Sequence, residues 1–135
     1  AWQDPSANRS LFASHFRGLV GHTDLIVLPE MFTTGFSMDA AALAETMDGP
    51  TVEWMREEAV SLGCAITGSV IIRDGDRHCN RLLWVTADGQ LQHYDKRHLF
   101  RMAKEQEHYA AGESRLVVRL KGWRTACCSA TLRKR

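Results

Sequence analysis

Apolar side chains recur at a spacing of three and four residues between positions 5 and 20. This period is typical of an amphipathic helix with one buried face. Asp4-Pro5-Ser6 marks the expected start, because proline is tolerated in the first turn of a helix, and Gly21-His22-Thr23 marks the expected end. The residues of the predicted buried face are Leu11, Phe12, His15, Phe16, Leu19 and Val20.

Asp24 to Leu28 form a short apolar run that ends abruptly at Pro29-Glu30. A run of this kind is typical of a strand that is buried on both faces of an α/β sheet. The residues that follow predict a loop over 31–38 that turns at Gly35, and then a short helical stretch over 40–45.

A second helix is predicted to begin at Gly49-Pro50 and to end at Gly63, a residue type that favours helix ends. Its expected buried face consists of Val52, Met55, Ala59 and Val60. Beyond this helix the period changes to that of strands, and Asp-Gly turns separate three runs, which predicts an antiparallel meander. The runs are 65–72, 82–86 and 91–94, and the turns are 74–76 and 88–89.

Residues 95–113 are polar and have no period, which is typical of a long loop that is functional or disordered. A further strand is predicted over 116–120, with a turn at Lys121-Gly122, whereas residues 126–135 permit no assignment. The order helix, strand, helix, meander, loop and strand favours a layered α/β domain. Helices are expected on one face of its sheet, with the other face still to be covered.

The chain has 135 residues, 44% of them hydrophobic, which is enough for one ordinary domain with a sizeable core. Its net charge of +1, with basic residues clustered only over 133–135, argues against a nucleic-acid partner. No apolar run approaches the roughly 20 residues of a membrane span, and residues 1–5 lack the features of a signal peptide. Four cysteines without paired metal spacing predict reduced thiols and a cytoplasmic protein.

Three charged residues are candidates for chemistry. Glu30 directly follows a buried strand, where α/β sheets place ligands, so its carboxylate is a candidate general base, with a structural ion pair as the alternative. Lys96 lies where a strand enters the long loop and is a candidate cation for an oxyanion, with a solvated lysine at a sheet edge as the alternative. Glu105 is a candidate partner that orients Lys96, or else part of a solvated charge run.

The six histidines do not predict a metal site, because no two of them have a spacing that presents two ligands on one helical face. The glycines form neither a phosphate-binding loop nor a dinucleotide fingerprint, so no cofactor is expected. The motif of a serine hydrolase is absent, and Ser69, inside a strand-like run, is expected to be structural.

Two segments resemble motifs of the nitrilase, or carbon–nitrogen hydrolase, superfamily. Asp24-Leu-Ile-Val-Leu-Pro-Glu30-Met-Phe resembles its strand-Pro-Glu motif, and Tyr94-Asp-Lys96-Arg-His-Leu-Phe100 resembles its lysine motif. The resemblance covers roughly residues 2–125 and implies a nitrilase-like four-layer αββα sandwich, of which this chain covers about the first half. Residues 32–38 and 94–103 further resemble the omega-amidase branch, which hydrolyses the terminal amide of 2-oxo acid amides such as 2-oxoglutaramate.

The resemblance also implies a role for each candidate residue. Glu30 would be the general base that takes the thiol proton, Lys96 would stabilise the tetrahedral oxyanion, and Glu105 would support Lys96 or the leaving ammonia. A cysteine thiolate would attack the carbon of a small amide substrate and form a thioester that water releases. A thiolate, a base and a fixed cation are sufficient for such acyl transfer, so no metal is expected.

The segment that carries the family's cysteine is the point at which this chain departs from the family. The nucleophile would fall near Ser129 or Ala130, neither of which is a cysteine. Cys128 is the nearest cysteine and the expected nucleophile, and Cys127 is the next candidate.

This departure predicts that residues 1–135 are a partial, truncated carbon–nitrogen hydrolase domain with a divergent tail over 126–135. The uncovered sheet of such a fragment favours self-association into a homo-oligomer. Two alternatives stay open: an amidase of the same superfamily that acts on carbamoyl or aliphatic amides, and a catalytically dead truncated fragment.

Overall fold

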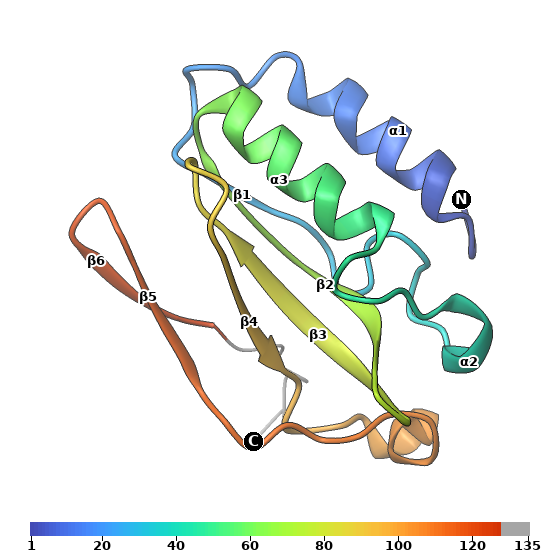
Figure 1. Ribbon diagram of the computed structural model, residues 1–135. Helices are drawn as coiled ribbons and strands as arrows, with labels where there is room; N and C mark the ends of the chain where they lie inside the picture. Colours follow the sequence, from blue (N-terminus) through green and yellow to red (C-terminus); the bar gives the residue numbers. More distant parts are fainter. Residues whose placement is uncertain (128–135) are drawn as a thin grey trace.

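The computed structural model of the protein describes residues 1–127, which form a four-stranded sheet between two helices and a β-hairpin (Figure 1). The strand order is β1-β2-β3-β4, and the hairpin is a separate two-stranded sheet, β5-β6. The strands are β1 (Leu25–Val27), β2 (Ala65–Asp74), β3 (Arg77–Val85), β4 (Leu91–Asp95), β5 (Leu116–Leu120) and β6 (Trp123–Cys127). The helices are α1 (Pro5–Phe16), α2 (Ala40–Leu43) and α3 (Pro50–Leu62), with 3-10 turns η1 (Arg101–Ala103) and η2 (Glu105–Glu107).

The predicted antiparallel meander is confirmed as β2, β3 and β4. The tight turn between β2 and β3 places Gly75 at a φ of +60°, a conformation that glycine adopts without steric cost. β1 pairs with β2 in parallel, with Ile26 opposite Ile66. A parallel pair needs a long connection, and α2 and α3 lie within it.

The main apolar core lies between the sheet and the helix pair α1 and α3 (Figure 1). Because successive side chains of a strand point to opposite faces, Ile66, Val70 and Ile72 of β2 and Leu83 and Val85 of β3 enter this core from one face of the sheet. The fully buried residues of this core include Val52, Met55, Ala59, Ile66, Ile72, Leu83 and Val85. The predicted buried positions Val52, Met55 and Ala59 are therefore confirmed.

Both ends of α3 have a local cause. Pro50 occupies the first turn, and the N-cap Gly49 has no side chain that could cap the helix. The carboxylate of Glu45 takes this place, accepting hydrogen bonds from Thr51 N at 2.8 Å and Thr51 Oγ1 at 2.6 Å. Gly63 ends the helix at a φ of +64°, as predicted.

Several details of the predicted elements were wrong. On the predicted buried face of the first helix, Leu11 and Val20 are 49% and 55% exposed, and His15 is exposed as well. α1 ends at Phe16 rather than at Gly21, because the chain continues in tight turns whose Leu19 N–H is donated to Phe16 O. Val60 is 57% exposed and lies outside the core face of α3. Val27 is 69% exposed, so β1 is not buried on both faces.

The β5–β6 hairpin covers part of the face opposite the helices. Val118 packs there against Ala65 and Trp84, with Leu25 at the margin of the cluster. Coverage stops before Val27, which explains the exposure of that residue. Strand β6 was not predicted, and it includes Ala126 and Cys127 of the segment for which the sequence permitted no assignment.

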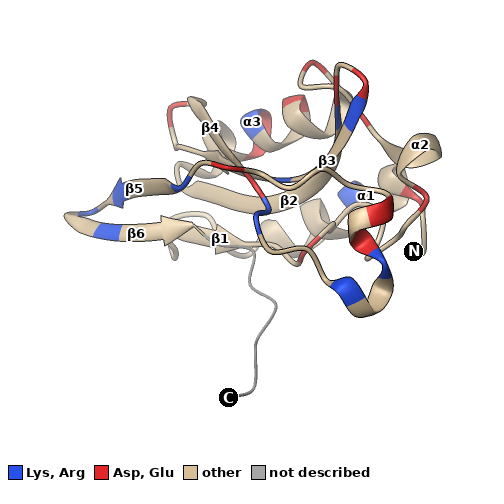
Figure 2. Cartoon of the chain, turned by 90° about the horizontal axis from the view of Figure 1, so that it is seen from below, with Lys and Arg blue, Asp and Glu red and all other residues tan. Residues whose placement is uncertain are grey.

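All charged side chains of residues 115–127 are basic, and Figure 2 shows blue segments on β5 and β6. They belong to Arg115, Arg119, Lys121 and Arg124, a clustering that the sequence analysis overlooked because it noted only the last three residues of the chain. Lys121 forms a surface ion pair of 3.3 Å with Asp24. Within residues 1–127, no helix has the length and apolar composition that crossing a membrane requires.

Candidate active site

Glu30 lies just beyond the carboxyl end of β1, on a segment that crosses closely over β2. Leu28 N donates to Thr67 O at 2.7 Å, and Met31 N donates to Ser69 Oγ at 2.8 Å, so Ser69 is structural as expected. A β-carbon added to Gly68 would lie 2.8 Å from Leu28 Cβ, so only glycine permits this approach. The backbone on both sides of Glu30 is therefore fixed to β2.

Lys96 follows β4 and is one of the least exposed residues of the protein, at 2%. Its backbone N–H is donated to Asn80 O at 2.9 Å, which continues the pairing of β3 with β4. Its ammonium group donates to Glu30 Oε1 at 2.8 Å and to Glu105 Oε2 at 2.9 Å. The alternative of a solvated edge lysine is therefore wrong, and the structure brings together Glu30 and Lys96 from distant parts of the chain.

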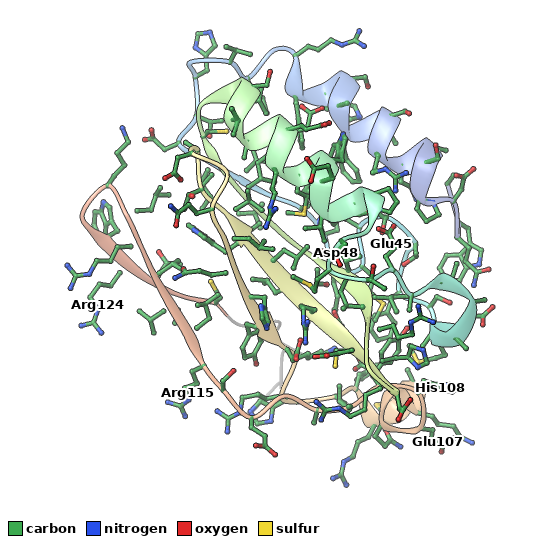
Figure 3. The ribbon with its side chains drawn as sticks, viewed as in Figure 1. Glu45, Asp48, Glu107, His108, Arg115 and Arg124 are labelled. Atoms are coloured by element: carbon green, nitrogen blue, oxygen red, sulfur yellow. The ribbon has the colours of Figure 1, made fainter. Side chains whose placement is uncertain are left out.

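Glu105 lies in η2 and is completely buried, so it is not part of a solvated charge run. Besides its contacts with Lys96, its Oε2 accepts a hydrogen bond from Phe100 N at 2.6 Å. Glu107, on the same turn, and His108, which follows it, are exposed and lie at the outer edge of the molecule (Figure 3). Glu105 thus holds Lys96 from the interior and closes the loop that contains both residues.

Asn80 is a fourth member of this cluster that the sequence analysis missed. Its Nδ2 donates to Glu30 Oε1 at 2.6 Å and to Glu105 Oε1 at 3.2 Å. The signal that could have found it is the register of β3 with β4, which brings Asn80 beside Lys96. Two carboxylates therefore share one ammonium group and one amide, and burial makes each of these hydrogen bonds important.

A pocket of about 220 Å³ adjoins the cluster and is lined by Glu30, Phe36, Lys96 and Phe100. The side chain of Glu30 is 34% exposed, whereas that of Glu105 is not exposed at all. Of the two carboxylates, Glu30 is therefore the one that a molecule in the pocket can contact. The ring of Phe36 lies 5.2 Å from Lys96 Nζ, which gives the ammonium group an aromatic as well as an acidic neighbour.

Arg81 stabilises the end of β4 from the opposite face of the sheet. Its guanidinium group donates to both carboxylate oxygens of Asp95, at 2.6 and 2.9 Å, and to Asp74 at 2.7 Å. Hydrogen bonding to Arg81, and then its charge, lowers the pKa of Asp74. Asp95 directly precedes Lys96, so this pair fixes the strand end from which the lysine projects.

Tyr109 connects the two loops that contribute to the pocket. Its hydroxyl group donates to Ser37 O in the loop after Glu30, and its backbone N–H is donated to Glu105 O. Burial, followed by the charges of Glu105 and Asp39, raises the pKa of Tyr109, so the hydroxyl group stays a hydrogen-bond donor near neutral pH.

The expected nucleophile Cys128 lies outside the described residues. Cys127 is half-buried in β6. Cys64 and Cys79 are buried free thiols, and burial raises the pKa of each, with the charge of Asp24 adding to the effect at Cys64 and that of Asp95 at Cys79. Both buried thiols are therefore poor nucleophiles near neutral pH.

No group of three histidine, cysteine or acidic side chains is placed to hold a metal ion anywhere in residues 1–127. The charged groups described here instead suit acyl transfer. A carboxylate facing a pocket can move protons, and a fixed ammonium group beside it can stabilise a developing oxyanion.

Comparison with known sequences identifies relatives of this chain. Residues 2–126 match the carbon-nitrogen hydrolase family. The chain is 46% identical over 123 residues to omega-amidase YafV of Escherichia coli strain K12, which covers 91% of this chain and 47% of that protein. It is 32% identical over 94 residues to 2-oxoglutaramate amidase of Bacillus subtilis strain 168, covering 67% of this chain and 36% of that protein. The chain thus matches about half the length of the omega-amidase and about a third of the length of the 2-oxoglutaramate amidase.

Solved structures show the same relationship. A CN-hydrolase superfamily protein from Xanthomonas campestris superimposes with a TM-score of 0.90 at 54% identity, over 93% of this chain and 47% of that chain. Nit3 of Saccharomyces cerevisiae superimposes with a TM-score of 0.76 at 25% identity, over 90% of this chain and 48% of that chain. The nitrilase-like α/β fold predicted from the sequence is thereby confirmed. The chain belongs to the carbon–nitrogen hydrolase family.

Proposed function

We propose that this chain supplies the general base and the oxyanion-binding cation of an omega-amidase. Such an enzyme hydrolyses the terminal amide of a small 2-oxo acid amide to an acid and ammonia. The observation that carries the proposal is the contact of Lys96 Nζ with Glu30 Oε1, 2.8 Å long, at the wall of a pocket. The similarity to an omega-amidase and to a 2-oxoglutaramate amidase supports the choice of substrate class.

In the proposed reaction, Glu30 accepts the proton of a cysteine thiol, and the thiolate attacks the amide carbon. Lys96 donates a hydrogen bond to the resulting oxyanion, and Glu105 positions Lys96. The carbon–nitrogen bond then breaks, and the proton held by Glu30 passes to the leaving ammonia. Water attacks the thioester while Glu30 takes its proton. Breakage of the carbon–sulfur bond then releases the acid, and Glu30 returns the proton to the leaving thiolate, which restores the thiol.

The proposed nucleophile is Cys128, with Cys127 as the second candidate. Alkylation by iodoacetamide at pH 7, followed by peptide mapping, tests this assignment. We expect one of these two cysteines to react faster than Cys64 and Cys79, and replacement of Glu30 by glutamine to slow that reaction. Equal, slow labelling of all four cysteines would count against a thiol-dependent enzyme.

Release of ammonia from a panel of amides tests the function itself. We expect release from 2-oxoglutaramate, and a loss of about 10²- to 10⁴-fold in Glu30→Gln, because this is the usual contribution of a general base. Glu57→Gln, a matched change on the exposed side of α3, should leave the rate unaltered. Release only from carbamoyl or aliphatic amides would assign a different amidase, and no release from any amide would identify a catalytically inactive fragment.

The proposal extends to the location and assembly of the protein. We propose a cytoplasmic protein, supported by the free thiols of Cys64 and Cys79. Residues 1–135 form part of one hydrolase domain, with a divergent tail over 126–135. Exposed apolar side chains on β1 and the hairpin, at Val27, Val117 and Trp123, support self-association into a homo-oligomer. Sedimentation that gives a monomer at every concentration would contradict this last proposal.

A further inference from the structure

Asn80 forms hydrogen bonds with all three charged residues of the cluster. Its side-chain amide donates to Glu30 Oε1 and to Glu105 Oε1, and its backbone oxygen accepts from Lys96 N at 2.9 Å. These contacts join strand β3, the end of β4, the segment after β1 and turn η2. One buried residue therefore touches three charged residues that come from three separate parts of the chain.

The orientation of the Asn80 amide is determined by its neighbours. Both contacts are with carboxylate oxygens, which only accept hydrogen bonds, so the NH₂ group and not the carbonyl group must face them. As a result, Asn80 Oδ1 is buried without a hydrogen-bond partner among the described residues. An unsatisfied buried carbonyl group costs free energy, so the favourable contribution of this side chain comes from its two donor bonds.

The balance of charge explains why a neutral donor is needed at this position. Glu30 and Glu105 approach the same ammonium group, so two carboxylates compete for one cation. A second cation would remove the negative charge that a base requires, whereas a third acceptor would add to the repulsion. A neutral amide donates to both carboxylates and leaves the charge of the cluster unchanged.

We propose that Asn80 is the positioning residue that holds Glu30 against Lys96, by joining the carboxylates of Glu30 and Glu105 through one side-chain amide. Asn80 does not line the pocket, so it acts on the reaction only through these neighbours. Its effect on catalysis rests on the proposed amidase function, but its effect on the cluster does not.

Exchanging the donor and the acceptor between positions 80 and 105 tests their contact through stability alone, so the test does not require catalytic activity. N80D keeps the size of the side chain but presents an acceptor to two carboxylates, and we expect it to lower Tm by roughly 5–10 °C. Adding E105Q restores the original charge of the cluster and puts an N–H donor toward position 80. Its amide oxygen remains able to accept from Phe100 N and from Lys96.

We therefore expect N80D/E105Q to regain at least half of the Tm lost in N80D. The control is N80D/E107Q, which changes the charge by the same amount on the exposed side of the same 3-10 turn and should not regain Tm. Losses in N80D and E105Q that simply add in the double variant would overturn the proposal, because they would show that Asn80 only fills space.

Steady-state kinetics then tests the consequence for the reaction. In N80D we expect kcat to fall roughly tenfold to a hundredfold with KM nearly constant, because the base is displaced while the pocket wall is intact. Thr51→Val is the stability control, since it removes the hydrogen bond from the buried Thr51 Oγ1 to Glu45 Oε1 at the start of α3, away from the cluster. A rise in KM with kcat constant would overturn the positioning role. If the wild-type chain releases no ammonia, the proposed function fails, and the exchange of donor and acceptor alone decides the role of Asn80.

Discussion

The two faces of strand β3 enter two buried regions with opposite physical requirements. Leu83 points into the apolar core beneath α1 and α3, where burial itself supplies stability and no directional partner is needed. Asn80 points into the charged cluster, where burial costs free energy unless each group finds a partner. The comparison teaches that the apolar core supplies the stability of the fold. Part of this stability offsets the free energy that burial of the charged cluster costs.

Among the substitutions considered, Lys96→Met should lower the free energy of unfolding most. It replaces a buried cation by an apolar side chain and leaves Glu30 and Glu105 without compensation. We expect a loss of about 3–5 kcal/mol in the free energy of unfolding, as for other buried pairs that lose one partner. Urea denaturation measures this loss. A stability within about 0.5 kcal/mol of wild type, the usual range for surface substitutions, would show that the cluster is not held by its charges.

Leu83→Ala makes a change of similar size in the apolar region. We expect a loss of about 3 kcal/mol, because the fully buried side chain leaves a cavity. Unlike the change at Lys96, this substitution should leave the turnover of each folded molecule within about twofold of wild type, since Leu83 faces away from the pocket. Activity normalised to the folded fraction checks the prediction, and its abolition would mean that the two regions are not separable.

Met55→Leu sharpens the contrast with a substitution that conserves volume. Met55 is completely buried in the same core, and such exchanges usually cost less than about 1.5 kcal/mol. An exchange of equal volume in the charged cluster, as in Lys96→Met, should cost at least twice as much. Thermal unfolding of both variants under one condition makes the comparison, and equal losses would refute it.

The smallest expected effect is a change in pH dependence at Asp74. Arg81 lowers the pKa of this carboxyl from its ordinary value of 3.8. A carboxyl group with a lowered folded-state pKa contributes stability that is present above the unfolded-state pKa and is lost as pH falls through the folded-state pKa. Asp74→Asn should therefore flatten the decline of stability between about pH 5 and pH 2. The free energy of unfolding of both proteins can be measured by urea denaturation at several pH values. An identical dependence on pH in the two proteins would contradict the prediction.

The helices and the meander were predictable because their causes are local. Pro50 and Gly63 define the ends of α3 through their own backbone preferences, and the Asp-Gly turns define the meander. The misses have non-local causes. Val27 has the composition of a buried strand residue, but its exposure depends on how far the β5–β6 hairpin reaches over the sheet.

The sequence by itself determined the α/β order, the strand ends that carry Glu30 and Lys96, and the family to which the chain belongs. Only the tertiary structure decided that Glu105 is buried beneath Lys96 and that Asn80 joins the two carboxylates. The reason is one of scale. A hydrophobic pattern assigns a residue to an element and a face, whereas a hydrogen bond requires two atoms within about 3 Å. That distance depends on strand register and loop closure together, which no local stretch of sequence specifies.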